Sequence, residues 1–323
     1  MALPYSPNLE ILAYEAFIRR AAELDLPFML KGSYVTRQYF ENPADRIPYD
    51  LDWVYMERVE NADEAQTLFN DWATRATELW QNDGVEFRSF RENAFWRMIE
   101  YAMADDFPTV NTDLLCWVNK EKFEDFSMDV SFNLPMDVPS VPLFYNPLQG
   151  EPFIILNTTP LSLQVAWKLH QSLTRLRFKD LFDLLHLLKH PDFDEAARRQ
   201  TMYALKKECR ADNTDITRLQ WLVAGNLQPL HPDPTADAGW QYWRHGRKQN
   251  DSYYFDYAER AEHITNPNAL PETLADFQQQ IREAFSKAGF NASAEITPAA
   301  DEDQSNPSLR KPGFIETIFN FFR

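Results

Sequence analysis

The stretch Leu30-Lys-Gly-Ser33, followed along the chain by Asp50-Leu-Asp52, decides how this sequence is interpreted. The second part opens a run over Asp50–Tyr55 whose composition favours a β-strand. Successive side chains of a strand point to opposite faces, so Asp50 and Asp52 are predicted to project together. Two neighbouring carboxylates repel each other, and a divalent cation is a natural partner for such a pair. Mg²⁺ in particular is held by carboxylates together with substrate phosphates.

A predicted glycine–serine turn lies upstream of the acidic pair. Gly32 is one of only 8 glycines in the chain, and with Ser33 it follows a strand predicted over Phe28–Lys31. The backbone N–H groups and the hydroxyl of such a turn suit phosphate oxygens. The alternative interpretation of Asp50 and Asp52 is a solvated strand edge, because a short Asp-x-Asp motif has low specificity on its own.

Composition sets bounds on the fold and on the partners. The chain has 323 residues, a length compatible with two domains, and a net charge of −17. This charge argues against a nucleic-acid coat or an anionic membrane surface as a partner of the whole molecule. Two cysteines, Cys116 and Cys209, are too few for a disulfide scaffold or a zinc knuckle. The sequence shows no signal peptide and no membrane-spanning run, which predicts a soluble cytoplasmic protein with no membrane partner.

Hydrophobic periodicity predicts mixed helices and strands up to about residue 157 and helices after it. In the first part, helices are expected over Ser6–Leu24, Tyr34–Phe40 and Ala62–Trp80, a loop over Pro135–Gly150, and strands over Phe28–Lys31, Leu51–Met56, Val85–Phe90, Ala94–Met103, Thr109–Asn119, Glu124–Asn133 and Phe153–Leu156. In the second part, helices are expected over Pro160–Gln171, Lys179–Lys189, Asp194–Cys209, Thr214–Ala224 and Pro271–Ala288, with His231–Tyr257 irregular. Thr158 or Thr159 is expected to cap the first of these helices, and Pro271 to lie in the first turn of the last.

A third acid, Asp129, lies on the polar face of the strand predicted over Glu124–Asn133. Apolar residues alternate there with Ser127, Asp129 and Ser131, so these three share a face. This face would bring Asp129 beside Asp50 and Asp52 if the two strands are neighbours. The alternative is an ordinary amphipathic surface strand.

The helical part carries a further cluster of charges. Lys168 lies among apolar residues, seven positions before Arg175, and Asp180 and Asp183 follow one helical turn apart. Lys179 is in position to pair with Asp183. The alternative interpretation is a set of helix-surface salt bridges, each worth only about 0.2–0.5 kcal/mol.

The order of these motifs resembles the nucleotidyltransferase AbiEii/AbiGii toxin family, which lies within the DNA-polymerase-β-like nucleotidyltransferase superfamily. The resemblance covers about Pro27 to His190. The motifs that carry it are Leu30-Lys-Gly-Ser33, Arg46 with Asp50-Leu-Asp52, Lys168, and Lys179-Asp180 with Asp183. The chain departs from the family pattern at Pro48, where a serine is frequent, and in the long spacing between Ser33 and Asp50.

The resemblance implies an α+β fold, with a mixed β-sheet nucleotidyltransferase core flanked by helices and followed by a helical domain. Together with the predicted elements, this gives a core over residues 1–157 and a helical domain over 158–290. Residues 291–323 are expected to form an acidic linker and a short apolar C-terminal helix, which must find a surface to cover it.

The resemblance also implies roles for individual residues. Three acids would bind Mg²⁺, and the third of them could also act as the general base: Asp50, Asp52 and Asp129. Four residues would bind the phosphates of the nucleotide: Gly32, Ser33, Arg46 and Lys168. Asp180 would orient Lys168 or the acceptor and is included among the catalytic residues, as is Lys168.

The implied function is the transfer of a nucleoside monophosphate from an NTP to an acceptor hydroxyl. Several members of the family that the chain resembles use tRNA as the acceptor and act as toxins with a cognate antitoxin protein. Two alternatives stay open. One is transfer to a protein or a small molecule, which the low basicity of the chain favours. The other is a non-catalytic binding protein on the same fold.

Overall fold

The structure is a computed structural model, and it describes residues 7–99, 108–136, 138–231, 235–245, 264 and 270–290. These residues form two compact units. The first comprises residues 7–35, 48–99, 108–136 and 138–159, and the second comprises 36–47 and the described residues from 160 to 290. The division at residues 157 and 158 stays a prediction, and the expected linker and apolar helix over 291–323 lie outside the described residues. The assignment of Thr36–Ile47 to the second unit was not expected from the sequence.

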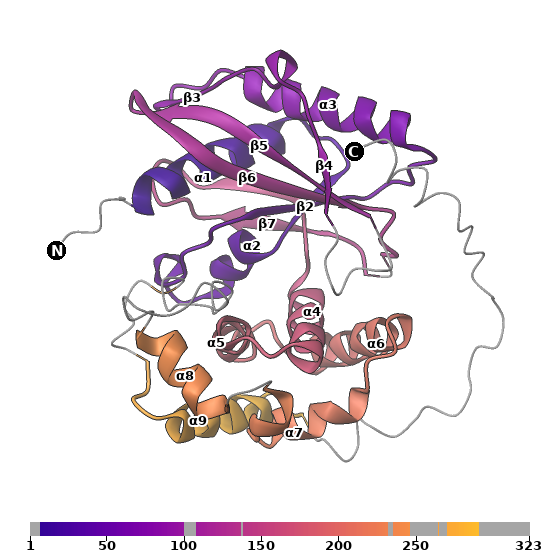
Figure 1. Cartoon of the computed structure of the whole chain (residues 1–323), viewed down its shortest axis with the longest axis vertical. Helices are drawn as coiled ribbons and strands as arrows, with labels where there is room; N and C mark the ends of the chain where they lie inside the picture. Colours follow the sequence, from indigo (N-terminus) through magenta and orange to yellow (C-terminus); the bar gives the residue numbers. More distant parts are fainter. Residues whose placement is uncertain are drawn as a thin grey trace. The chain divides into compact units, whose positions relative to one another are not determined.

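The first unit is built on one mixed sheet (Figure 1). Its strands run in the order β3-β5-β6-β2-β1-β8-β7, with β4 paired to β5 beside β3. β2 pairs with β6 and β1 with β8 in parallel, and the other pairs are antiparallel. The mixed α+β fold predicted from the sequence is therefore confirmed. The strands are β1 (Phe28–Lys31), β2 (Leu51–Tyr55), β3 (Val85–Phe87), β4 (Arg97–Ile99), β5 (Thr109–Val118), β6 (Glu121–Phe132), β7 (Val141–Tyr145) and β8 (Phe153–Thr158).

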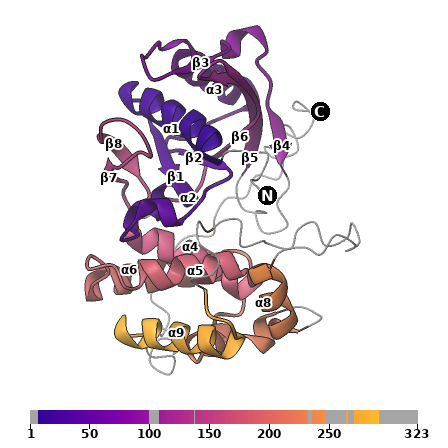
Figure 2. The ribbon, with the colours of Figure 1, turned by 90° about the vertical axis from the view of Figure 1, so that its left-hand side faces the viewer.

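Two long helices, α1 (Pro7–Glu23) and α3 (Ala62–Glu78), cover the same face of this sheet (Figure 2). Their packing is aromatic. Trp72 of α3 stacks on Phe28 of β1, with ring centroids 3.9 Å apart, and meets Phe17 of α1 and Trp53 of β2 edge-on. Since side chains of a strand alternate, the residues next to Phe28 and Trp53 face the opposite side, and Asp52 is one of them.

The second unit is helical. It contains α4 (Leu161–Thr174), α5 (Phe178–Leu187), α6 (Glu195–Ala211), α7 (Leu219–Val223), α8 (Ala236–His245) and α9 (Leu274–Lys287), and a one-turn helix, α2 (Ser33–Thr36), leads into it from the first unit. Single 3-10 turns lie over Arg37–Tyr39, Pro43–Asp45, Ile216–Arg218 and Gln228–Leu230, and one more, Phe90–Glu92, lies in the first unit. The rings of Phe178, Trp240, Trp243 and Phe277 pack together and join α5, α8 and α9.

Two expected irregular segments contain regular structure. The loop expected over Pro135–Gly150 includes strand β7, which pairs with β8 at the edge of the sheet. The proline of β7, Pro142, lies where the register of the pairing shifts, and such a position tolerates a residue without an N–H group. The stretch expected to be irregular from His231 includes α8, whose aromatic residues Trp240 and Trp243 are buried on one face at helical spacing.

Two expected helix starts are also wrong. Thr158 ends strand β8 and Thr159 donates its hydroxyl to the carbonyl oxygen of Leu30 at 3.2 Å, so neither residue caps α4. Pro160 itself takes the N-cap position. Helix α9 begins after Thr273, whose hydroxyl accepts a hydrogen bond from the backbone of Asp276, so Pro271 lies before the helix. None of the helices in the described part of the chain has the length and apolar character that a membrane span requires.

Candidate active site

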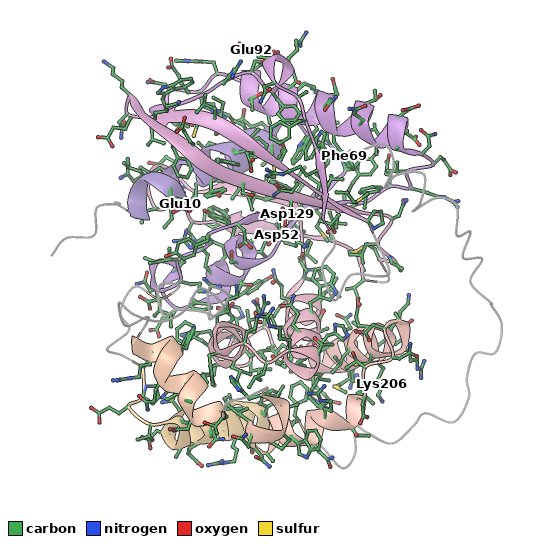
Figure 3. All side chains as sticks on the ribbon, viewed as in Figure 1. Glu10, Asp52, Phe69, Glu92, Asp129 and Lys206 are labelled. Atoms are coloured by element: carbon green, nitrogen blue, oxygen red, sulfur yellow. The ribbon has the colours of Figure 1, made fainter. Side chains whose placement is uncertain are left out.

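Asp52 and Asp129 are partners in the parallel pairing of β2 and β6. Residues paired across two strands point to the same face, and neighbouring strands lie about 4.8 Å apart, so the two side chains stand next to each other. Figure 3 shows them side by side on the two strands. Both are shielded from solvent, Asp129 more than Asp52. The predicted meeting of the acid from Glu124–Asn133 with the Asp-x-Asp strand is thus present for this pair.

The acid pair is the centre of a row of polar side chains that runs across five strands. Lys31 of β1 pairs with Asp52, with its ammonium 3.3 Å from Oδ1. On the other side, Asn111 of β5 pairs with Asp129 and donates from Nδ2 to its Oδ1 at 2.6 Å. Arg97 of β4 in turn donates to Oδ1 of Asn111. The pairing register of the sheet therefore puts a cation on one side of the acids and an amide on the other.

Asn111 is held in a fixed orientation. Its amide nitrogen also lies within hydrogen-bond distance of the Ser127 hydroxyl, at 2.8 Å, and of the Met128 carbonyl, at 3.3 Å. Its amide oxygen is taken by Arg97, and its side chain is buried. With its oxygen committed to Arg97, the amide presents its nitrogen to Asp129, which fixes one carboxylate oxygen of that acid.

Gly32 makes room for the Asp52 carboxylate. Its φ of +74° lies in the left-handed region that favours glycine, and a β-carbon built on it would be 2.2 Å from Oδ2 of Asp52. Ser33 follows, with a buried hydroxyl that has no hydrogen-bond partner among the described residues. A buried hydroxyl without a hydrogen-bond partner is costly and rare. The Ser33 hydroxyl is therefore a candidate to bind a polar ligand at this turn.

Asp50, the first of the three predicted metal ligands, lies at the start of the paired region of β2. It is exposed and precedes the first residue of β2, Leu51, where the pairing with β6 begins. Outside the ladder the alternation of a strand no longer fixes the direction of a side chain. Within the described ranges, no group of three or more His, Cys, Asp and Glu residues is arranged to hold a metal ion. The pairing of β2 with β6 therefore brings Asp52 and Asp129 together, and the role of Asp50 as a third metal ligand stays a prediction.

Lys168 and Asp180 lie in the second unit, in a buried network of charges. The Lys168 ammonium is 2.8 Å from Asp183 and 3.4 Å from Asp180. Asp183 also receives Nε of Arg46 at 2.8 Å, and Asp180 receives Nε of Arg177 at 2.5 Å. Sequence reasoning expected surface pairs as the alternative for these residues, but both acids are almost fully buried.

The electrostatics of this network keep both acids ionised. Burial alone would raise the pKa of Asp183, but the guanidinium of Arg46 and the ammonium of Lys168 outweigh it, so the pKa lies well below its usual range. For Asp180, Arg177 and Lys168 likewise outweigh burial and lower the pKa. Arg46 is 3% exposed and anchors Thr36–Ile47 to α5. This gives Arg46 a structural role, and its predicted role in nucleotide binding stays a prediction.

Sequence reasoning did not assign roles to Lys31, Asn111 and Arg97. Lys31 directly precedes Gly32, and its strand position opposite Asp52 follows only from the antiparallel pairing of β1 and β2. Asn111 stands on the polar face of β5 by alternation with its buried neighbours Val110 and Thr112, a signal that could have been found. Only the fold shows which strand β5 pairs with and in which register, and therefore that Asn111 lies next to Asp129.

A mixed sheet that presents two adjacent carboxylates beside a glycine–serine turn is compatible with the nucleotidyltransferase class of enzymes. The match to a family profile is more specific. The chain belongs to the family described as nucleotidyl transferase AbiEii toxin, type IV toxin–antitoxin system, whose profile matches residues 16–304. The resemblance inferred from the motifs is therefore confirmed. No curated protein matches the chain.

Two solved structures are similar to this chain. MenT4, a nucleotidyltransferase toxin from Mycobacterium tuberculosis H37Rv, has 13% sequence identity and a TM-score of 0.49, with 99% of this chain and 95% of that chain covered. A protein from H. pylori assigned as a nucleotidyltransferase has 14% identity and a TM-score of 0.40, with 87% of this chain and 91% of that chain covered.

Proposed function

We propose that this protein transfers a nucleoside monophosphate from an NTP to an acceptor hydroxyl, with a divalent metal ion bound by Asp52 and Asp129. The observation that carries the proposal is the register of β2 and β6, which sets the two carboxylates side by side. Membership of the toxin family supports a role as the toxin of a toxin–antitoxin pair in the cytoplasm, with an antitoxin protein as its partner.

The donor set fits a hard divalent cation. Mg²⁺ is commonly bound by one or two carboxylates, with waters and substrate phosphates completing its octahedral shell. Two adjacent carboxylates therefore suffice, and a third protein ligand is not required. Because Gly32 has no β-carbon, Oδ2 of Asp52 can lie against the backbone of the glycine–serine turn. When bound, such an ion stabilises charge on the phosphates and lowers the pKa of an attacking hydroxyl.

The residues of the chain would then divide the remaining work. The unpartnered hydroxyl of Ser33 and the backbone at Gly32 would bind phosphate oxygens. Asp129, held by Asn111 through one oxygen, would act as the general base for the acceptor hydroxyl. The predicted roles of Lys168 at the triphosphate and of Asp180 in orienting it form part of the same proposal. The close pairing of Lys168 with Asp180 supports the second role.

The acceptor is the open part of the proposal. We propose tRNA as the acceptor because of the family resemblance. The alternative is a protein or small-molecule acceptor, which the formal charge of −17 favours. An RNA acceptor requires a local surface of cations, because phosphates dominate the affinity of proteins for nucleic acids.

The test is transfer of label from each α-³²P-labelled NTP, with Mg²⁺, in the presence of total tRNA, of a protein extract and of small metabolites in separate reactions. The wild type should label one fraction, and Asp52→Asn should label none while keeping its fold. Asp71→Asn is the matched control, because Asp71 is exposed on α3. Label in tRNA supports the first acceptor, and label in protein or small molecules supports the alternative. Equal transfer by Asp52→Asn would refute the proposed site, and no transfer by the wild type would favour the non-catalytic alternative.

A further inference from the structure

Lys31 is the cation nearest to the acid pair that the described contacts show. Its ammonium is 3.3 Å from Oδ1 of Asp52, and the two residues are register partners on β1 and β2. Antiparallel partners face the same side of a sheet, so the lysine is directed along the row toward the acids by the fold itself. The strand pairing therefore places the two residues next to each other, unlike surface ion pairs that form between two flexible side chains.

The surroundings make this ion pair stronger than an ordinary surface pair. The side chains of Lys31 and Asp52 are 21% and 19% exposed, whereas pairs on the helix surfaces, such as Arg75 with Asp71, are about half exposed or more. Partial burial weakens solvent screening. The neighbour of Asp52 in the row is a second carboxylate, Asp129, so a cation beside Asp52 relieves repulsion within the acid pair as well.

A metal ion at Asp52 changes the sign of this interaction. A divalent cation and an ammonium that share one carboxylate repel each other, and the charge that the metal supplies makes the lysine unnecessary as a counter-ion. The ammonium therefore favours the metal-free state and disfavours the metal-bound state.

We propose that Lys31 is a built-in counter-cation of the acid pair, which competes with the divalent metal at Asp52 and sets its affinity. This inference rests on the proposed function, since it concerns the same acid pair. Lys31 is a positioning residue in this role: it acts on the Asp52 carboxylate, and the metal affinity of the site is lower than that of the two acids alone. A low affinity of this kind leaves the metal to arrive together with the nucleotide, whose phosphates supply the remaining ligands.

The experiment measures Mn²⁺ binding to the purified full chain without nucleotide, by electron paramagnetic resonance of the free ion. Lys31→Gln removes the ammonium and keeps a side chain of similar length, and Lys31→Arg keeps the charge. Lys122→Gln is the matched control, because Lys122 lies on β6 of the same sheet, is half exposed, and pairs with Glu124 away from the acid pair. Asp52→Asn defines the signal that comes from other acids of this negative chain.

Lys31→Gln should bind Mn²⁺ about 10-fold more tightly than the wild type, and Lys31→Arg should stay within about 2-fold of it. Lys122→Gln should also stay within about 2-fold. Without metal, the Tm of Lys31→Gln should lie about 2 °C or more below that of the wild type, and Mn²⁺ should restore it. Binding by Lys31→Gln alone would support the same conclusion in a stronger form.

Equal or weaker Mn²⁺ binding by Lys31→Gln would overturn this inference and leave the proposed function intact. If wild type and Lys31→Gln bind no more Mn²⁺ than Asp52→Asn, both this inference and the metal site fall together. The first outcome refutes only the role of Lys31, whereas the second refutes metal binding by the acid pair, so the two failures are distinguishable.

Discussion

Gly32 faces Asp52 so closely that a β-carbon at residue 32 would lie 2.2 Å from Oδ2 of that acid. Real β-carbons do not approach an oxygen so closely, so one of the two groups would have to move. The carboxylate is the group that can move, and it is one half of the acid pair. The identity of residue 32 is therefore tied to the position of a proposed metal ligand.

We expect Gly32→Ala to lower label transfer at least 100-fold, because the methyl group displaces the Asp52 carboxylate. The positive φ adds a stability cost of about 1–2 kcal/mol. Gly84→Ala is the matched control: Gly84 has a φ of +78° and its β-carbon would lie 2.7 Å from Oδ1 of Asn119, and the two residues lie just before β3 and just after β5. The control should lose stability and keep activity. Equal activity loss in both variants would show that the effect is one of folding.

We expect Asn111→Ala to lower both Mn²⁺ affinity and label transfer about 10- to 100-fold, as is usual when a hydrogen-bond partner of a metal ligand is removed. The reason is that Asp129 loses the donor that fixes its Oδ1 at 2.6 Å. Asn70→Ala is the control, since Asn70 accepts a hydrogen bond from Trp96 in the same unit without contacting the acids. Unchanged Mn²⁺ affinity in Asn111→Ala would mean that Asp129 is held by other contacts or is not a ligand.

We expect the second unit to lose stability when the pH falls below about 4. The folded-state pKa values of Asp180 and Asp183 lie below the unfolded value of about 3.9, so their stabilisation is complete above that value and disappears as the pH falls through the folded values. Asp183→Asn should lower the free energy of unfolding at pH 7 by about 3–5 kcal/mol, because Arg46 keeps a buried charge without its partner. It should also flatten the acid dependence.

Urea unfolding at pH 7, 5, 4 and 3 measures both effects. Asp192→Asn is the control, because Asp192 is 79% exposed in the same unit. If Asp183→Asn does not fold, the double variant Arg46→Met with Asp183→Leu removes both charges and should regain much of the stability at pH 7. An acid dependence as steep as that of the wild type in this double variant would contradict a contribution from Asp183, because Asp180 alone should leave a shallower one.

We expect two neighbouring isoleucines of β8 to differ in how much the same substitution destabilises the protein. Ile154 is 59% exposed and opposes Phe144 on the edge strand, whereas Ile155 is 2% exposed. Ile155→Thr should destabilise the protein by about 1.5–3 kcal/mol, because it buries a hydroxyl and leaves space, and Ile154→Thr should change stability by less than about 0.5 kcal/mol. Urea unfolding of the two variants tests the register of β8, since a slip by one residue would reverse their order.

The sequence predicted the core of the fold well where a single periodicity dominates. The helix over Ala62–Trp80 and the strand over Phe28–Lys31 lie within two residues of α3 and β1, because their apolar residues repeat at one spacing and their ends carry clear signals. The strand β7 and helix α8 were missed. Pro142 suggested a loop where the chain forms β7. The polar residues around Trp240 masked the apolar face of α8, which becomes evident only from its packing against α5 and α9.

The candidate site was predictable in part for a similar reason. Alternation along β2 and β6 identified the faces of Asp52 and Asp129, and the register of the pairing was needed to make them neighbours. The side chains that surround the acids, Lys31 and Asn111, come from strands on either side of them, so no local pattern could connect them to the pair. Asp50 lies one residue before β2, so its place in the metal site stays a prediction.

The path of the chain has a consequence for its synthesis. Residues Thr36–Ile47 follow the glycine–serine turn directly but belong to the second unit, and Arg46 finds Asp183 137 positions later. At the usual 5–20 residues per second, a ribosome takes about 7–27 s to make that distance. Over that interval the guanidinium of Arg46, which lies between the glycine–serine turn and Asp52, lacks the Asp183 carboxylate that it contacts in the folded chain. The segment that links Ser33 to Asp50 therefore obtains its anchor on α5 only after the residues of all the described strands, the last of which ends at Thr158, have been made.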